Sequence, residues 1–287
     1  MIESKQCVVC AITFDDPVIK YCRSCGRPLD MGIKRQAISF SSRWFPVWFL
    51  FAMFVGTNMG GEGDLGLYLM DCILIAWVVL IVKRNKISVT ALIGRTSVGF
   101  NWLWVPFIAI VMFVFGIGAT LLSWYPIMLV NAQFASDVLS EPVTDSATSF
   151  FVLAVVIAPV LEEIIFRGLL FTRLADKWGI NRAIIVSSVV FGMLHLDPIG
   201  KSIFGVMACV IYMRTRTLWI PIALHSFHNL IAWYLMVGAP VEQDTSSDLQ
   251  GLLMSGIMAI ALSLPVIYYL LHKWWPSRQS LLPYQTN

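Results

Sequence analysis

Long apolar segments separated by short polar connections run through the chain from about residue 44 to residue 271. A membrane-spanning α-helix needs about 20 predominantly apolar residues, and most of these segments approach or reach that length. The pattern predicts eight transmembrane helices, near residues 44–60, 65–82, 102–125, 149–172, 181–196, 199–213, 217–237 and 251–271. The fifth and sixth are short, and Pro159, Pro221 and Pro265 predict kinks in the helices that contain them.

The composition favours a membrane protein over a soluble domain. Of the 287 residues, 58% are hydrophobic and 13% are charged, whereas soluble domains carry about 25% charged residues. We therefore expect an all-α polytopic membrane protein. It divides into a polar module at residues 1–42, the first three helices at 43–130, and the other five helices at 131–287.

Positive charges lie almost entirely in alternate connections between the predicted helices. With eight helices, 18 of the 20 Lys and Arg residues fall on the side that holds both termini, and the opposite loops carry acidic residues. Arg167 lies within a helix, and Lys201 is the basic residue that the pattern assigns to an opposite loop. Cytoplasmic loops of membrane proteins are enriched in Lys and Arg. The pattern predicts a multi-pass protein of a bacterial inner membrane with both termini in the cytosol.

The polar N-terminal module contains two pairs of cysteines. Cys7-x-x-Cys10 and Cys22-x-x-Cys25 are separated by eleven residues, a spacing that resembles a short zinc ribbon. Four thiolates can close a tetrahedral site around structural zinc, and a reducing cytosol favours thiolates over disulfides. A redox pair or a free cysteine cluster is the alternative. We expect a zinc-ribbon-like module that recruits a cytosolic protein partner or restricts access, and nothing in it indicates nucleic-acid binding.

Three ionisable residues interrupt the fourth apolar segment: Glu162, Glu163 and Arg167. A charged side chain at bilayer depth costs roughly 2.5–3.5 kcal/mol on insertion scales, so three of them in six residues indicate a function. Glu163 and Arg167 are four residues apart and can pair on one helix face. Glu162 is rotated by about 100° and stays free for acid–base chemistry. The Glu163–Arg167 pair by itself is equally well explained as a structural ion pair.

Other polar groups lie at a similar depth in two later helices. His195 ends the fifth predicted helix, and His225, His228 and Asn229 lie in the seventh. With a rise of about 1.5 Å per residue, Glu162, His195 and His225 lie roughly 12–21 Å from the predicted cytosolic ends of their helices. Groups at one depth can share a cavity, which would lie nearer the cytosolic face. A glutamate and a histidine can activate water there, because no serine or cysteine is arranged as a nucleophile beside them.

Three motifs occur in order within about residues 149–237: Glu162-Glu163-x-x-x-Arg167, Phe191-x-x-x-His195 and His225-x-x-x-Asn229. Together they resemble the motifs of the CPBP family, the CAAX prenyl endopeptidases and bacteriocin-processing membrane proteases, also called the Abi family. The resemblance implies an eight-helix intramembrane glutamate endopeptidase with a conical catalytic cavity. The N-terminal zinc-ribbon-like module lies outside the region of resemblance.

The resemblance also implies roles for individual residues. Glu162 and His195 would activate water, and His225 with Asn229 would stabilise the oxyanion, for which an imidazole and an amide are suitable donors. Glu163 and Arg167 would organise the site, and His228, one turn from His225, is expected to support it. The histidines and glutamates could instead bind a catalytic zinc. We favour catalysis without metal because the chain has no His-Glu-x-x-His motif.

The predicted function is hydrolysis of a peptide bond in a membrane-associated substrate, either prenylated or of the bacteriocin-leader type. One alternative is a non-proteolytic scaffold or bacteriocin self-immunity protein of the same fold, which would have no need for the complete set of polar residues. Another is a proton-coupled transporter, since Glu and His chains in membranes also relay protons. Transporters usually show inverted repeats, whereas the polar groups here lie in one half of the chain.

Overall fold

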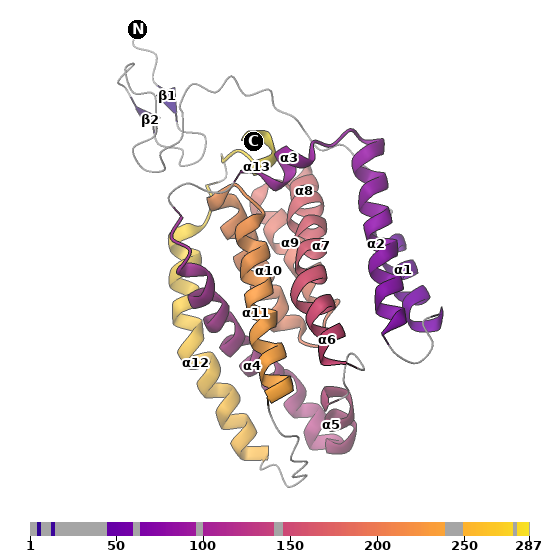
Figure 1. Cartoon of the computed structure of the whole chain (residues 1–287). Helices are drawn as coiled ribbons and strands as arrows, with labels where there is room; N and C mark the ends of the chain where they lie inside the picture. Colours follow the sequence, from indigo (N-terminus) through magenta and orange to yellow (C-terminus); the bar gives the residue numbers. More distant parts are fainter. Residues whose placement is uncertain are drawn as a thin grey trace.

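Helices account for nearly all of the described part of the chain, as the apolar pattern predicts. The computed structural model describes residues 5–6, 13–14, 45–59, 64–95, 100–140, 146–238, 249–277 and 280–286. The principal helices are α1 (Phe45–Met59), α2 (Leu65–Arg84), α4 (Trp104–Val130), α9 (Ile180–Gly192), α10 (Pro198–Thr215), α11 (Trp219–Gly238) and α12 (Leu249–Trp274), arranged as a bundle in Figure 1. Shorter helices are α3 (Val89–Ile93), α5 (Ala132–Ser140) and α13 (Pro283–Thr286). The strands β1 (Lys5–Gln6) and β2 (Thr13–Phe14) pair antiparallel.

One further helical segment, residues 147–178, changes its winding four times. It consists of α6 (Ala147–Phe150), the π-helical η2 (Phe151–Ile157), α7 (Ala158–Glu163), the π-helical η3 (Ile164–Phe171) and α8 (Thr172–Trp178). Insertions of π-helical turns are rare in proteins, and where they occur they are often found at functional sites. This helix carries both glutamates of the first motif, and they end α7 between the two π-helical segments.

All eight predicted segments are helical, but they are not equally suited to cross a membrane. Among the described residues, four helices have the length and hydropathy of a span: α2, α4, the segment Ala147–Trp178, and α12. The apolar parts of α1 and α9 are shorter, at Val47–Gly56 and Ile180–Gly192. The chain is therefore a helical protein with several candidate spans, and the topology of eight spans stays a prediction.

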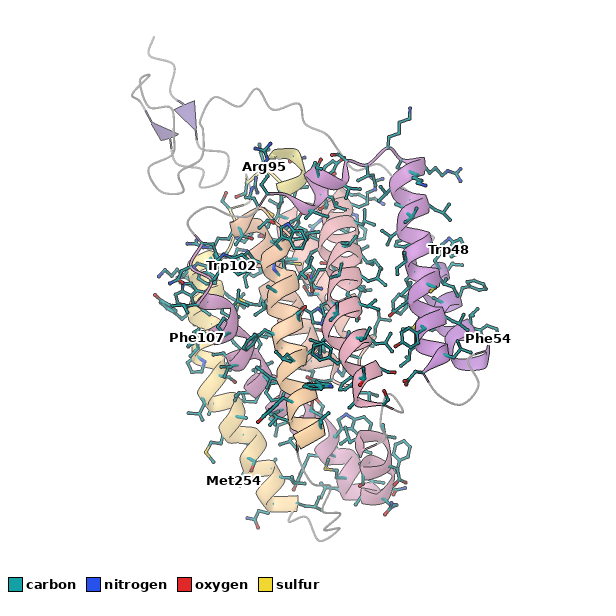
Figure 2. The ribbon with its side chains drawn as sticks, in the orientation of Figure 1. Trp48, Phe54, Arg95, Trp102, Phe107 and Met254 are labelled. Carbon is teal, nitrogen blue, oxygen red and sulfur yellow. The ribbon has the colours of Figure 1, made fainter. Side chains whose placement is uncertain are left out.

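The outer surface of the bundle is rich in apolar side chains. Trp48 and Phe54 on α1, Phe107 on α4 and Met254 on α12 project outward in Figure 2, and between 36% and 62% of each side chain is exposed. Soluble monomers rarely expose contiguous apolar surface of this kind, so it favours contact with lipid. Together with the four apolar helices, it indicates a multi-pass location in a membrane.

The fifth predicted helix, 181–196, ends earlier than expected. Helix α9 stops at Gly192, and a turn at residues 193–197 connects it to α10. A side chain at Gly192 would overlap Ser202 and the Pro198 carbonyl, so this close return of the chain needs glycine. Asp197 then caps α10, because its Oδ1 accepts a hydrogen bond of 2.9 Å from the Gly200 amide. At 13 residues, α9 is about 20 Å long, short of the roughly 30 Å hydrocarbon core of a bilayer.

The turn after α9 lies beside the middle of α4. A Cβ built at Gly116 lies 3.7 Å from Asp197 Oδ2, and Gly116 is roughly 18 Å from the first residue of α4 and 21 Å from the last. In addition, Nε1 of Trp124 donates a hydrogen bond of 3.1 Å to the Leu196 carbonyl. The prediction that Lys201 lies in a loop at the opposite face is therefore wrong. It is the fourth residue of α10 and lies at mid-depth in the bundle.

The opposite end of α10 is closed by two short helices. The Tyr212 hydroxyl donates a hydrogen bond of 3.0 Å to the Leu92 carbonyl of α3, and the Ser88 amide donates one of 3.2 Å to the Tyr284 hydroxyl of α13. Arg216 also donates to the Leu281 carbonyl. In Figure 1, α3, α13 and the C-terminus lie together at this end. These contacts tie the described C-terminal residues to the same end of the bundle as the last turn of α10.

Candidate active site

A buried chain of three polar side chains joins two helices. Arg167 Nη1 donates a hydrogen bond of 2.8 Å to Glu163 Oε1, and His225 Nδ1 lies 3.0 Å from the same oxygen. The exposed fractions of the three side chains are 1%, 0% and 2%. The Arg167 guanidinium also lies 4.3 Å from the centre of the Phe191 ring. Buried charges are stable only when paired and hydrogen-bonded, and this arrangement supplies both an ion pair and a cation–π contact.

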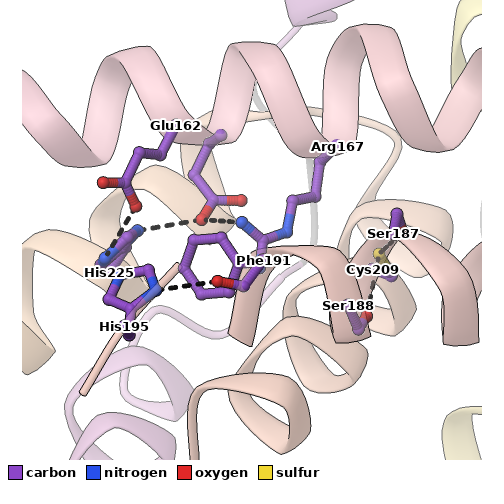
Figure 3. A network of polar contacts seen from close by, with 9 residues as sticks. Glu162, Arg167, Ser187, Ser188, Phe191, His195, Cys209 and His225 are labelled. Carbon is purple, nitrogen blue, oxygen red and sulfur yellow. Dashed lines mark hydrogen bonds and ion pairs between the residues drawn. The ribbon is translucent and has the colours of Figure 1, made fainter. Parts of the chain in front are cut away.

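Glu162 differs sharply from its neighbour Glu163. Its side chain is 27% exposed, and Oε2 lies 3.9 Å from His225 Nε2 (Figure 3). Within the described residues, Oε2 of Glu162 is buried and has no hydrogen-bond partner. The two carboxylates therefore differ in their surroundings: Glu163 is fully buried and held by an arginine and a histidine, whereas Glu162 is partly exposed; Oε2 of Glu163 also has no hydrogen-bond partner among the described residues. His225 lies between them.

His195 lies in the turn after α9 and not in a helix. Its Nδ1 is 2.8 Å from the Phe191 carbonyl oxygen. Since a carbonyl can only accept, Nδ1 must carry the proton, which leaves a lone pair on Nε2 in the neutral ring. The Phe191 ring centre is 4.6 Å from that of His195 and 5.9 Å from that of His225, and Figure 3 shows the two histidines close together on the side of Glu162. The network thus gathers groups from α7, α11 and the α9–α10 turn.

Asn229 is tied to the irregular helix. Its Nδ2 donates a hydrogen bond of 2.7 Å to the Ala154 carbonyl in η2. In π-helical winding that carbonyl would accept from the residue five positions later, which is Pro159 and has no N–H. Asn229 therefore satisfies a carbonyl that proline leaves without a partner. One turn along α11, Nε1 of Trp233 donates a bond of 2.8 Å to the Ala147 carbonyl.

His228 contacts a residue that sequence reasoning missed. Its Nε2 lies 3.3 Å from Lys201 Nζ, and its ring lies between those of Phe204, at 5.1 Å, and Phe113, at 5.6 Å. The sequence pattern places Lys201 in an opposite loop because it counts residues 181–196, although short, as a membrane-crossing helix. The 13-residue length of the apolar part of α9 is the signal that could have identified a turn inside the bundle.

Two serines and a cysteine form a separate buried cluster. Cys209 Sγ lies 3.7 Å from Ser187 Oγ and 3.9 Å from Ser188 Oγ, where α9 and α10 pack. Figure 3 shows these residues on the other side of Arg167 from the two histidines. The nucleophilic side chains of this cluster are therefore not next to the free carboxylate.

The metal predictions concern different parts of the chain. Cys7, Cys10, Cys22 and Cys25 lie outside the described residues. The described strands pair Lys5 with Phe14 and Gln6 with Thr13. Among the described residues, no group of three or more His, Cys, Asp or Glu side chains has the arrangement of a metal site.

The segment that carries the candidate active-site side chains matches a known family model, and the chain is similar to two curated proteins. Residues 144–231 match the family model described as Type II CAAX prenyl endopeptidase Rce1-like. The "Putative membrane peptidase YdiL" of Bacillus subtilis is 28% identical over 157 residues, which cover 53% of this chain and 64% of that protein. An "Uncharacterized protein" of Mycoplasma capricolum subsp. capricolum is 34% identical over 100 residues, which cover 31% of this chain and 28% of that protein.

The chain spans less than two thirds of the length of both relatives. No solved structure matches it. The matched segment contains every residue of the carboxylate–histidine network, together with Asn229 and Lys201. Residues 144–231 therefore form a domain similar to the Type II CAAX prenyl endopeptidases of the Rce1-like family.

Proposed function

We propose that the chain is a membrane-embedded endopeptidase in which water, activated by Glu162 and His195, attacks a peptide bond. The unequal surroundings of the two adjacent glutamates support this most directly. Glu163 is fully buried and is engaged by Arg167 and His225, whereas the Glu162 side chain is 27% exposed and lies 3.9 Å from His225. Among the described residues each glutamate has a buried Oε2 without a hydrogen-bond partner, and the exposed fraction of Glu162 allows a reacting water to reach its carboxylate. The similarity of residues 144–231 to a peptidase family supports the reaction class.

The proposed reaction begins with proton transfer to Glu162. As a carboxylate, it takes a proton from water while the water oxygen attacks the carbonyl carbon of the scissile bond. Nε2 of His195 accepts the second O–H of the same water and orients it. The proton on Glu162 then passes to the leaving nitrogen as the C–N bond breaks. One water is consumed, a carboxylic acid and an amine are formed, and Glu162 is again a carboxylate.

The oxyanion of this reaction needs hydrogen-bond donors, and we propose His225 and Asn229 for that role. His225 must carry a proton on Nε2 to donate, and its Nε2 lies 3.9 Å from Glu162 Oε2 at the edge of the site. Asn229 has two amide hydrogens, of which Ala154 takes one. The other is available to a substrate oxygen. Glu163 and Arg167 act by holding His225 in place.

The proposed substrate is a membrane-associated peptide or protein, cleaved near the cytosolic side. The distribution of Lys and Arg supports this orientation, which puts both termini in the cytosol. A protease-cleavable epitope tag after residue 287 tests it in bacterial membranes. Added protease should remove the tag in inverted vesicles and not in intact spheroplasts, and a tag inserted at residues 141–145 should behave in the opposite way. The reverse pattern would reject this orientation.

Purified full-length protein in lipid nanodiscs provides the test of the reaction. The probes are two internally quenched peptides of the same sequence, one with a farnesylated cysteine near its C-terminus and one without. Wild-type protein should release fluorescence, and the Glu162→Ala and His195→Ala variants should not, although they insert and elute as the wild type does. Undiminished cleavage by either variant would reject the mechanism. Glu162→Ala protein in native membranes can then trap the natural substrate for identification by mass spectrometry.

For the N-terminal module we propose a structural zinc ion bound by Cys7, Cys10, Cys22 and Cys25. The spacing of the two pairs supports four-thiolate coordination, and the pairing of β1 with β2 supports a hairpin that carries the first pair. Such a closed site has no open position for a substrate. Its role is then to fold the module, which could present a surface to a cytosolic protein.

A further inference from the structure

Lys201 is a cation inside the bundle that the proposed reaction does not use. It is the fourth residue of α10, and the turn before α10 lies beside the middle of α4. A lysine at membrane depth costs several kcal/mol unless polar or acidic groups compensate it. Its surroundings should therefore explain why it is there.

The groups around Lys201 come from four parts of the fold. Nζ lies 3.3 Å from Nε2 of His228 on α11 and 5.9 Å from the centre of the Phe204 ring on α10. The carboxylates of Glu162 on α7 and Asp197 in the preceding turn interact with its charge.

The carboxylates of the site differ in the groups that compensate them. Arg167 neutralises Glu163 through a direct contact. Asp197 is held by the Gly200 amide at the start of α10, where a helix stabilises negative charge. Glu162 and Asp71 of α2, a buried carboxylate that also interacts with Glu162, then remain, and Lys201 is the cation that interacts with Glu162 from another helix.

We propose that Lys201 is a positioning residue of the site, which donates a hydrogen bond to His228 and supplies the positive charge that faces Glu162. A donor at Nε2 places the proton of the neutral His228 ring on Nδ1. The fixed ring packs on Phe204, whose ring centre lies 5.0 Å from that of His225. Lys201 would thus influence His225 through His228 and Phe204. The catalytic consequence rests on the proposed function, whereas the contact with His228 does not.

A simpler alternative is a structural pair between Lys201 and Asp197, which are four residues apart at the start of α10. In that case the protonation and position of the His228 ring would not depend on Lys201. Loss of either partner would then have the same effect, namely a less stable α10. The experiment below separates the two explanations.

Imidazole nitrogen spectra of the full-length chain test the contact directly. The chain has only four histidines, so ¹⁵N-histidine protein in nanodiscs gives few ring signals, which His→Gln variants assign. Lys201→Met should shift the Nε2 signal of His228, and Lys201→Arg should shift it less. His272, which is exposed on α12, is the internal control. Unchanged His228 signals in Lys201→Met protein would overturn the proposal, as would equal shifts in an Asp197→Asn variant.

Cleavage of the farnesylated quenched peptide tests the consequence. Lys201→Met should lower kcat about tenfold to a hundredfold, the effect expected from losing a charged hydrogen bond, with little change in KM. Lys201→Arg should recover most of the rate, and Lys83→Met, at an exposed position near the end of α2, should match the wild type. A wild-type kcat in Lys201→Met protein would overturn the positioning role. If the wild type itself is inactive on the peptide, the proposed function fails, and the ring spectra alone decide whether Lys201 holds His228.

Discussion

Nδ1 of His225 lies 3.0 Å from Oε1 of Glu163, the same oxygen that accepts the hydrogen bond from Arg167. Helical spacing alone pairs Glu163 with Arg167, whereas His225 comes from a helix 62 residues later. Glu163 is therefore both the counter-ion of Arg167 and the group that orients the His225 ring. With Nδ1 held in this way, Nε2 of His225 faces the second carboxylate, 3.9 Å from Glu162 Oε2.

Replacing Glu162 with Gln should abolish cleavage and leave the fold intact. The amide has almost the same shape but cannot take a proton from water, and loss of a general base costs about 10²–10⁴-fold in rate. Stability should stay the same or rise, because the substitution removes a negative charge from a largely apolar surrounding. Quenched-peptide kinetics and unfolding in mixed micelles measure the two effects. A variant that retains a tenth or more of the wild-type kcat would contradict Glu162 as the base.

Replacing Glu163 with Gln should, unlike the replacement of Glu162, lower the stability of the protein. Glu163→Gln leaves Arg167 buried without its counter-ion, and breaking a buried pair costs about 3–5 kcal/mol. The unfolding free energy should fall accordingly. The double variant Glu163→Gln with Arg167→Met should regain part of the stability, because no unpaired charge remains, but little activity, since His225 has lost its orienting group. Equal stability of Glu162→Gln and Glu163→Gln proteins would argue against the division of roles.

Asn229 is a donor to the Ala154 carbonyl and a proposed donor to the oxyanion, and a substitution at Pro159 can separate these two roles. Asn229→Ala should lower both stability and activity, because the Ala154 carbonyl and the proposed oxyanion each lose a donor. Adding Pro159→Ala restores an N–H that can bond to the Ala154 carbonyl in π-helical winding. The double variant should therefore recover stability but not kcat. Recovery of both would mean that Asn229 acts only as an anchor for η2.

Zinc analysis of purified protein tests the N-terminal module and the metal-free mechanism together. Wild-type protein should contain one zinc ion per chain, since four thiolates close one tetrahedral site. The variant Cys7→Ser with Cys10→Ser should contain none and still cleave the quenched peptide. The Glu162→Gln protein serves as a control, because it should keep its zinc. A second zinc ion in the wild type, lost together with activity on addition of a chelator, would point to a catalytic metal.

Much of the site follows from local rules that operate within one helix. The approximate positions of the helical segments follow from the apolar runs along the chain. The pairing of Glu163 with Arg167, and the different direction of Glu162, follow from 3.6 residues per turn. Matched depth predicted that His225 would meet the glutamates, and it does.

The remaining features depend on contacts between helices. Whether α9 crosses the membrane or turns inside the bundle depends on how closely Gly192 can pack against α10, which hydropathy does not encode. The π-helical winding of η2 depends on an outside donor for the Ala154 carbonyl, and that donor lies 75 residues away. The sequence pattern places Lys201 in a loop because it does not show that α9 ends at Gly192 and turns inside the bundle.

The sequence by itself determined that Glu162, Glu163 and Arg167 carry charge into an apolar helix, because burying an ionisable group is costly wherever it occurs. The tertiary structure decided which of those charges are neutralised and which are left free. Glu163 is fully buried against Arg167 and His225, whereas Glu162 is 27% exposed and lies 3.9 Å from His225. That distinction depends on the distances between helices, because a change of less than about 1 Å in the donor–acceptor distance can make or break a hydrogen bond.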